Sequence, residues 1–264
     1  AIDSRLEVNI LDIGQGNCGV VRTSAGRTII IDGGGFSGET QFDTGRSLIA
    51  PFLWYHDIHY IDYMIITHPE ADHYKGLIYI AENFEIGTLV KNKDKSTSSA
   101  YKKLMKTVTD KGIKVFHPDK NNRQIDLNPV TLTFFPTGKN YCLNSNSLVV
   151  KVELNNFSVL FSGDILEDRE YALVRNYSNA IASDILIAPH HGSDTSNTEF
   201  FLENVSPKSV IISCGWRNRY GFPADEVIQR YKNQGIHIYR TDMNGAVLIK
   251  TDGQEYQTLI NRQL

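Results

Sequence analysis

Four residues of types that bind metal ions occur within positions 68–73, directly after an apolar run. They are His68, Glu70, Asp72 and His73. Successive side chains of extended backbone alternate in direction, so His68 and Glu70 face the same way and can reach one metal. Asp72 and His73 follow at the turn into a helix and can reach a second. Imidazole and carboxylate together suit zinc, manganese or iron. The alternative is a polar loop in which Asp72 caps the helix and His73 faces solvent.

Two further groups of ligand-type residues also follow apolar runs. Ser162-Gly163-Asp164 ends the run 157–162 and places one carboxylate at the tip of a strand. Pro189-His190-His191-Gly192-Ser193 follows the run 184–188 in the same way. Adjacent histidines point in different directions, so one can bind a metal while the other faces substrate. Taken alone, the first group is also typical of an ordinary strand-end turn, and the second of surface histidines.

The three groups together constrain the fold more than any one of them. Carboxyl ends of buried strands converge at one edge of a sheet, where binding sites are usually built. We therefore expect a site for two divalent metals, roughly 3.5–4 Å apart, with a bridging hydroxide as nucleophile. Such a site lowers the pKa of water, so no serine or cysteine nucleophile is required. Asp72, Asp164 and the two histidines 190 and 191 are the expected catalytic groups.

Hydrophobic patterning predicts strands that alternate with helices along the whole chain. In both halves antiparallel strands come first, followed by strands mixed with helices. This order predicts an α+β fold, a four-layer αββα sandwich, with residues 1–264 as one domain. The predicted strands are 6–13, 20–23, 27–32, 63–67, 86–90, 130–135, 147–154, 157–162, 184–188, 209–213, 236–239 and 246–250. The predicted helices are 47–55, 73–83, 99–111, 166–176, 197–205 and 224–233.

Composition excludes several other classes of protein. The chain has 264 residues, 41% of them hydrophobic and 22% charged, so global disorder and a disulfide scaffold are excluded. The net charge of −3 excludes a histone-like polycation. No apolar run approaches the roughly 20 residues of a membrane helix. The cysteines, Cys18, Cys142 and Cys214, form no CxxC pair. We expect them to be free buried thiols.

The ligand groups resemble the signature of the metallo-β-lactamase superfamily, His-x-His-x-Asp-His, with Glu70 in place of the second histidine. The chain is more similar still to the metallo-β-lactamase-like domain of ComEC-type DNA-internalisation (competence) proteins. The similarity runs in family order from residue 6 to about residue 250. The matching segments are 11–16, 28–34, 68–73, 144–150, 162–164, 189–193 and 217–223.

The resemblance implies a set of metal ligands. Asn144 stands where the superfamily has a further histidine, and with Glu70 it makes the first metal site rich in oxygen. Oxygen ligands favour manganese or magnesium relative to zinc. Asp32 matches a superfamily aspartate that orients metal ligands. Its alternative role is that of a turn residue before three glycines. The implied ligands are His68, Glu70, Asp72, His73, Asn144, a bridging Asp164, and a histidine of the pair His190 and His191.

The resemblance also implies a phosphodiesterase or nuclease that acts on DNA and degrades the strand that is not imported. Residues 91–123 contain nine Lys and one Arg against three Asp, a local charge of +7. Lys102, Lys103 and Lys106 of this segment can hold a phosphate backbone, or simply form a solvated helix face.

A second cationic group follows Trp216. Arg217, Arg219 and Tyr220 suit phosphate binding and base stacking, or form a structural loop that packs on Trp216. Lys75 stands where the family usually has glycine, and it either contacts phosphate or is a solvated helix residue.

Departures from the family leave other functions open. Phe222 stands where the family often has a histidine, and the chain, which begins at Ala1, lacks the family's membrane channel. We therefore expect an excised or stand-alone domain, extracytoplasmic or associated with a membrane channel partner. One alternative is a hydrolase of another phosphodiester, such as a choline-phosphate ester. A second is a non-catalytic metal-binding module of an uptake machine. The Glu70 and Asn144 substitutions argue against β-lactam hydrolysis.

Overall fold

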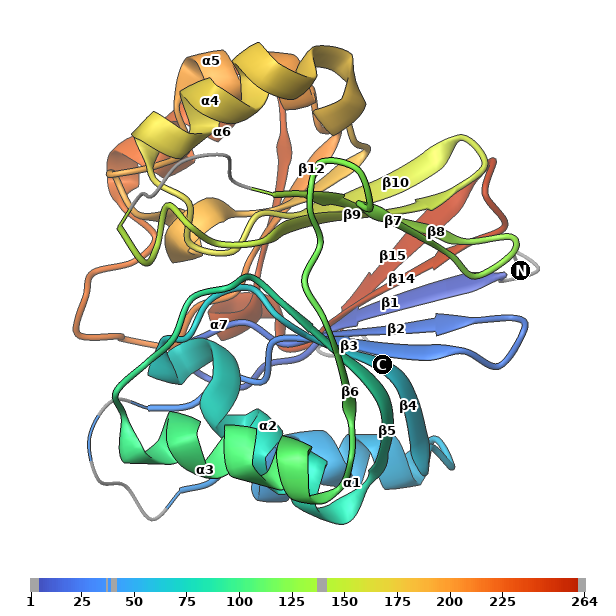
Figure 1. The fold of residues 1–264 in the computed structure, drawn as a ribbon. Coiled ribbons are helices and arrows are strands. Elements are labelled where there is room, and N and C mark those ends of the chain that lie inside the picture. Colours follow the sequence, from blue (N-terminus) through green and yellow to red (C-terminus); the bar gives the residue numbers. More distant parts are fainter. Residues whose placement is uncertain (1–4, 37, 39–41, 137–141, 261–264) are drawn as a thin grey trace.

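Two β-sheets pack face to face and form the centre of the molecule (Figure 1). The computed structural model describes residues 5–36, 38, 42–136 and 142–260. The first sheet has the strand order β15-β14-β1-β2-β3-β4-β5-β6. Its strands are β1 (Leu6–Ile10), β2 (Gly19–Thr23), β3 (Thr28–Ile31), β4 (Tyr60–Ile66), β5 (Glu85–Lys91), β6 (Lys114–Phe116), β14 (Val247–Thr251) and β15 (Tyr256–Ile260).

The second sheet has the strand order β13-β12-β11-β10-β9-β8-β7. Its strands are β7 (Gln124–Asp126), β8 (Thr131–Phe135), β9 (Val149–Leu154), β10 (Phe157–Phe161), β11 (Ile185–Ile187), β12 (Ser209–Ile212) and β13 (His237–Arg240). In each sheet one half is antiparallel and the other is parallel. The parallel halves are β3 to β6 and β10 to β13. Parallel strands bring their carboxyl ends to one edge, and the ligand-type residues follow these ends.

Helices cover the outer face of each sheet (Figure 1). The helices on the first sheet are α1 (Ala50–Tyr55), α2 (Ala71–Asn83) and α3 (Ser99–Asp110), and those on the second are α4 (Glu167–Tyr177), α5 (Glu199–Val205) and α6 (Asp225–Asn233). A short helix, α7 (Thr241–Asn244), joins β13 to β14. The order helix, sheet, sheet, helix confirms the predicted αββα sandwich.

Three apolar layers hold these elements together. The central layer lies between the two sheets and includes Val8, Ile31, Phe134 and Val150. Two outer layers pack the helices onto their sheets, one around Leu77 and the other around residues such as Leu173 and Phe201. Each fully buried side chain of this size contributes roughly 1.5–3 kcal/mol through the hydrophobic effect. The tight central layer sets how the strand ends of the two sheets meet.

The structure differs from the sequence-based prediction at several elements. β1 ends at Ile10, and the rest of the predicted strand is irregular backbone. The edge strands β6, β7 and β15 were not predicted, because two have only three residues and none is fully buried. Within the described residues no helix is long and apolar enough to cross a membrane. The three cysteines are free, but Cys142 is exposed and not buried as expected.

Candidate metal centre and substrate cleft

The ends of four parallel strands carry the candidate ligands and their supports. Thr67 and His68 follow β4, and Asp32 follows β3 in the same sheet. Asp164 follows β10, and the turn 189–192 follows β11 in the opposite sheet. β3 pairs with β4, and β10 pairs with β11, so each sheet delivers neighbouring residues to one place.

Four of these side chains converge on one point. The ligand atoms of Asp72, His73, Asp164 and His191 all lie within 4.8 Å of one another. Asp164 is central: its carboxylate oxygens lie 3.2 Å from His73 Nε2 and 3.5 Å from His191 Nε2. His191 Nε2 also lies 3.6 Å from Asp72 Oδ2. The cluster therefore joins residues from both sheets.

Two further predicted ligands border this cluster. His68 Nε2 lies 4.0 Å from Asp164 Oδ2 and 4.0 Å from Glu70 Oε2. His68 is fully buried, whereas the Glu70 side chain is 39% exposed and stands at the opening of the site. Burial, followed by the charge of Asp72, raises the pKa of Glu70. His68 thus lies 4.0 Å from both Glu70 and Asp164, as a residue that shares a cation with them would.

Asp32 holds the first sheet's part of the cluster. Its Oδ1 accepts a hydrogen bond from Thr67 N at 2.8 Å, and its Oδ2 accepts from the Thr67 hydroxyl at 2.7 Å. Oδ2 also lies 2.8 Å from His73 Nδ1. Since a carboxylate only accepts hydrogen bonds, Nδ1 of His73 carries the proton and Nε2 faces the cluster. The structure thus gives Asp32 the contacts of a residue that orients a ligand.

The turn after β11 separates the roles of the two adjacent histidines. His190 and His191 both adopt left-handed backbone, with φ of 49° and 55°. Such backbone costs roughly 1–3 kcal/mol per residue. The turn directs His191 inward, where Nδ1 lies 2.9 Å from Ser213 O. The His190 side chain stays 22% exposed, and its Nδ1 lies 3.2 Å from Thr195 Oγ1. His191 is therefore the histidine of the cluster, and His190 borders it, 3.9 Å from Asp164 Oδ2.

A glycine shapes the turn that carries Asp164. Gly163 has φ of +58°, and a Cβ atom there would lie 2.8 Å from the Ser147 Cβ. Asp164 N donates to Ser147 Oγ at 3.1 Å. Ser147 N in turn donates to Asn144 O at 2.8 Å, and Asn144 is half-buried in this turn. The structure thus connects the backbone of Asn144 to the turn that carries Asp164. That the Asn144 side chain binds a metal stays a prediction.

Opposite charges stabilise one another in the cluster. Burial works against ionisation of Asp164, but His73 and His191 hold its pKa well below the usual range. Burial lowers the pKa of His191 while Asp164 and Asp72 raise it, with a net value of about 10. Burial and the neighbouring His73 lower the pKa of His68 to about 3. The cluster therefore favours ionised carboxylates and a compensating positive charge in a largely buried space.

The buried polar atoms fit a divalent metal. Nε2 of His68, His73 and His191 and Oδ1 of Asp164 are buried and make no hydrogen bond of good geometry among the described residues. Leaving buried polar atoms without partners costs roughly 1–3 kcal/mol each. Imidazole nitrogens and carboxylate oxygens that converge in this way are the donor set of zinc, manganese and iron sites. The arrangement excludes the reading of His73 as a solvent residue, because His73 is fully buried.

A cleft of about 440 Å³ opens beside the cluster. Asp72 belongs to both the cluster and the cleft, so the two are adjacent. The predicted residues Arg219 and Tyr220 line it. Sequence reasoning did not select Phe36, Gln15 or Trp216 as site residues, since isolated aromatic and amide residues carry no motif. The lining residues are Gly14, Gln15, Gly35, Phe36, Asp72, Gly215, Trp216, Asn218, Arg219 and Tyr220.

The predicted phosphate-binding lysines have varied surroundings. Lys75 Nζ donates to the carbonyl oxygens of Phe36 and Gly38, both at 2.7 Å, and so holds the loop that bears Phe36. Lys103 pairs with Glu82 at 2.7 Å, and Lys106 with Asp110 at 2.5 Å. The roles of these lysines in binding phosphate stay predictions.

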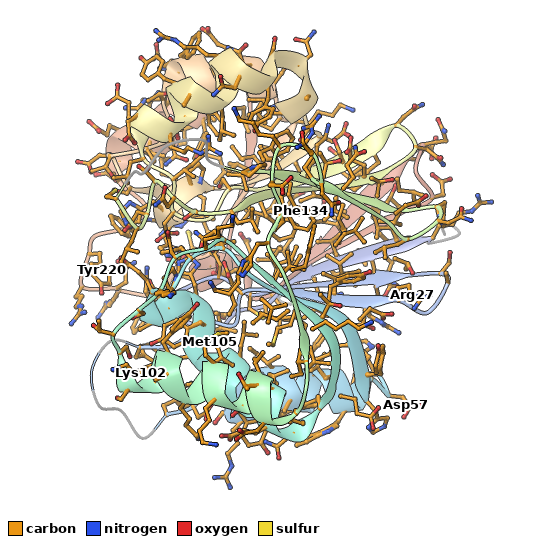
Figure 2. The ribbon with its side chains drawn as sticks, in the orientation of Figure 1. Arg27, Asp57, Lys102, Met105, Phe134 and Tyr220 are labelled. Carbon is orange, nitrogen blue, oxygen red and sulfur yellow. The ribbon has the colours of Figure 1, made fainter. Side chains whose placement is uncertain are left out.

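The basic segment 91–123 does not form one surface. Lys91 and Lys111 donate hydrogen bonds to backbone carbonyl groups. Lys102 projects into solvent from α3, on the side of the molecule where Tyr220 lies (Figure 2). Lys120 and Arg123 line a separate cavity of about 750 Å³ against α4. The segment's charge is thus divided between the two helical layers.

Comparisons with known proteins agree with this architecture. The Metallo-beta-lactamase superfamily model matches residues 11–216. ComE operon protein 3 of Bacillus subtilis is 29% identical over 93% of this chain and 33% of its own length. Competence protein ComA of Neisseria gonorrhoeae is 27% identical over 93% of this chain and 32% of its own length. The chain thus spans about a third of the length of these curated relatives.

A solved structure shows the same fold. Igni18, a metallo hydrolase from Ignicoccus hospitalis, superposes with a TM-score of 0.57 at 14% identity, covering 96% of this chain and 98% of its own. The expected resemblance is confirmed by the family match and by the competence relatives. This chain belongs to the metallo-β-lactamase superfamily and is related to ComEC-type competence proteins.

Proposed function

We propose that this protein is a metal-dependent phosphodiesterase that hydrolyses DNA. The observation that carries the proposal is the position of Asp72, which belongs both to the buried ligand cluster and to the cleft. Asp72 shares the cluster with the candidate ligands, and it shares the cleft with aromatic and guanidinium groups that suit nucleotides. Chemistry and substrate recognition thus meet at one residue.

The ligand cluster suits two divalent cations. His68 and Glu70 would hold the first, Asp72, His73 and His191 the second, and Asp164 would lie between them. Cations at such a site lower the pKa of water and stabilise the charge that develops on a phosphate under attack. Three carboxylates among these ligands favour manganese or magnesium relative to zinc.

The protein's own groups position the substrate and move protons. His190 is the one histidine of the site that borders the solvent side, with Nε2 3.9 Å from Asp164 Oδ2. Its contact with Thr195 orients the ring, and burial lowers the pKa of His190. The neutral imidazole would therefore accept a proton through Nε2 from the attacking water. Arg217 and Arg219 lie beside the cleft and would bind the phosphates that flank the scissile bond.

Competence relatives support DNA as the substrate. Competence protein ComA and ComE operon protein 3 are both about three times as long as this chain. We extend the proposal accordingly: this domain acts on DNA beside a membrane channel, outside the cytoplasm. In that setting its hydrolysis would degrade the strand that is not imported.

A small phosphodiester is the second candidate substrate. It is favoured by the ion pairs of Lys103 and Lys106, which neutralise part of the basic surface expected for DNA. A choline-phosphate ester fits less well. The guanidinium groups of Arg217 and Arg219 lie on the rings of Trp216 and Tyr220, where a quaternary ammonium would meet like charge.

A cleavage assay tests the proposal. Metal-stripped protein is reloaded with manganese, magnesium or zinc and mixed with labelled DNA or with a choline-phosphate ester. We expect cleavage of DNA that depends on metal and disappears in Asp164→Ala. Protein that binds its metals but cleaves only the choline ester would support the second candidate. Binding of metal without cleavage of either substrate would identify a non-catalytic module.

A further inference from the structure

We propose that the cleft beside the metal cluster binds unpaired bases by stacking, which makes a single-stranded polynucleotide the preferred substrate. This inference rests on the proposed nuclease function and adds the strand state of the substrate. It concerns the aromatic platform, which we define as Trp216, Tyr220 and Phe36. The metal ligands themselves do not distinguish single from paired strands.

The platform exposes large aromatic surfaces at the mouth of the site. Trp216 is 70% exposed and Tyr220 is 46% exposed, although both line the cleft. Phe36 lines the same cleft from the loop that Lys75 holds in place. Exposed aromatic groups that gather at a cleft are typical of binding sites, whereas single exposed residues are not. The platform therefore exposes aromatic surface, most of it on Trp216, to a flat, apolar partner.

A row of rings connects the platform to the metal cluster. Tyr220 stacks on Phe222 with ring centroids 5.6 Å apart and an angle of 15° between the planes. Phe222 continues the row toward His191, at 6.5 Å and 27°. Phe222 also meets the ring of His190 at 5.5 Å. A base bound at the platform would thus be separated from the metal ligands by one or two aromatic rings.

The loop that bears the platform is held rigidly. Asn218 Nδ2 donates to Gly215 O at 3.0 Å and to Phe222 O at 2.6 Å. Its Oδ1 accepts from Tyr220 N at 3.2 Å and from Phe222 N at 3.0 Å. Gly215 N donates to Gln15 Oε1 at 3.3 Å, which ties the loop to the first sheet. Such preorganisation reduces the entropy lost when a ligand binds.

Guanidinium groups accompany the rings. The Arg217 guanidinium carbon lies 4.5 Å from the centre of the Trp216 ring, and that of Arg219 lies 4.8 Å from the centre of the Tyr220 ring. Arg219 Nη2 also donates to Tyr220 Oη at 2.7 Å. Stacking rings interleaved with cations are the pattern of surfaces that bind single strands, because the rings stack on bases while the cations bind phosphates.

A duplex cannot use this platform without opening. In paired DNA each base face is covered by its neighbours, so stacking on Trp216 requires a base that is unpaired or extruded from the helix. A single unpaired base can present its face to the cleft, whereas a base pair within a duplex presents only its edges. Single-stranded substrate therefore gains the stacking contacts, and duplex substrate does not.

Fluorescence of Trp216 tests the binding step directly. The chain has two tryptophans, Trp54 and Trp216, so Trp54→Phe leaves Trp216 as the reporter. The probes are a phosphorothioate oligothymidylate, an abasic strand of equal length and the matching duplex, added to metal-loaded protein. We expect the oligothymidylate to quench the emission and the other two to quench it far less. Equal quenching by the abasic strand would overturn the inference.

Cleavage kinetics provide the second test. We expect wild-type kcat/KM for oligothymidylate to exceed that for a strand with abasic sites around the cleaved bond by about tenfold or more, the usual scale of base stacking. Trp216→Ala should bring this ratio near one, and Trp216→Phe should restore most of it. Tyr55→Ala is the matched control, because Tyr55 is 86% exposed on α1 and Asp57 beside it lies far from Tyr220 (Figure 2). Its ratio should equal the wild-type value.

The stacking inference and the proposed nuclease function can be refuted separately. Faster cleavage of duplex than of single strands, or a ratio that Trp216→Ala leaves unchanged, would overturn the stacking inference while the nuclease function stands. Absence of cleavage of any DNA would refute the proposed function, and quenching of Trp216 would then still report whether the platform binds bases.

Discussion

At the scale of single residues, backbone conformation decides which side chains can bind metal. His190 and His191 are neighbours in the sequence, and no sequence pattern distinguishes their roles. The left-handed backbone of both residues turns His191 onto Ser213 O and leaves His190 at the solvent side. The sequence therefore predicts a histidine ligand after this strand, but only the turn geometry shows which histidine it is.

We expect alanine at these two positions to have different effects. His191→Ala should reduce both the metal content of the protein and its cleavage of DNA. His190→Ala should keep the metal content while lowering kcat roughly 10²–10⁴-fold, the usual contribution of a general base. Metal analysis and cleavage rates on the same preparations check this. Equal loss of metal in both variants would contradict the separate roles.

Asp32 provides a second test at this scale. Its carboxylate accepts from Thr67 and fixes the proton of His73 on Nδ1. An amide in Asp32→Asn offers one acceptor oxygen and a competing donor, so we expect metal affinity to fall about 10–100-fold. Asp57→Asn is a suitable control, because that side chain is 96% exposed and pairs with the surface residue His59. Competition with a metal chelator measures both affinities, and unchanged affinity in Asp32→Asn would refute the orienting role.

Strands and loops differ in how well their sequence predicts them. Buried strands such as β3 and β11 are predictable because their apolar residues are continuous. The edge strands β6 and β7 have exposed or half-buried residues and no such signal. The aromatic loop 215–222 has no periodic pattern either, and its shape depends on hydrogen bonds to Asn218. The motifs of the metal cluster were therefore predictable, whereas the cleft was predictable only in part, through Asp72, Arg219 and Tyr220.

The two cationic elements should contribute unequally to DNA binding. The charges of Lys103 and Lys106 are partly neutralised by Glu82 and Asp110. Arg217 and Arg219 lie on aromatic rings at the cleft. We expect the double change Arg217→Glu and Arg219→Glu to raise KM for DNA more than the double change Lys103→Glu and Lys106→Glu.

Salt dependence measures this difference. Each lost phosphate contact should reduce the slope of log affinity against log salt by about 0.7–0.9. Substitution of both arginines should therefore lower the slope by more than one unit, and substitution of both lysines should lower it by less. A larger effect from the lysine pair would place the phosphate backbone over α3.

At the scale of the whole molecule, the site depends on how the two sheets face each other. His73 lies on α2, which follows β4 of the first sheet, and His191 lies on the turn after β11 of the second, yet their ring centroids are 5.5 Å apart. The chain also returns at its end, where β14 pairs with β1 in the first sheet. Periodicity identifies a strand but not the sheet to which it belongs. The sequence therefore predicts the layers and the convergence of the ligand groups, whereas the assignment of each group to one of two facing sheets requires the structure.

The stability of the folded protein should depend on pH through Glu170. This side chain is fully buried and accepts hydrogen bonds from Asn197 N and Thr198 N. Burial raises its pKa from 4.5 to about 7. The folded state then binds more protons than the unfolded state between these values, so its stability falls as pH rises from 4.5 to 7. The expected loss is about 3 kcal/mol.

Comparison with Glu170→Gln isolates this effect. Glutamine does not titrate, so the difference in unfolding free energy between wild type and variant should shift by about 3 kcal/mol over that pH range, to the disadvantage of wild type. Urea denaturation at several pH values measures the difference. A difference that stays constant from pH 4.5 to 7 would show that Glu170 titrates normally.

The most direct test of the central claim is the rate of DNA cleavage as a function of bound metal. Metal-free protein is titrated with manganese, and bound metal and cleavage of a single-stranded oligonucleotide are measured in the same samples. We predict no cleavage without metal, a rise that reaches its plateau at two equivalents, and no rise at any level in Asp164→Ala. Protein that takes up two equivalents and cleaves no phosphodiester would contradict the account.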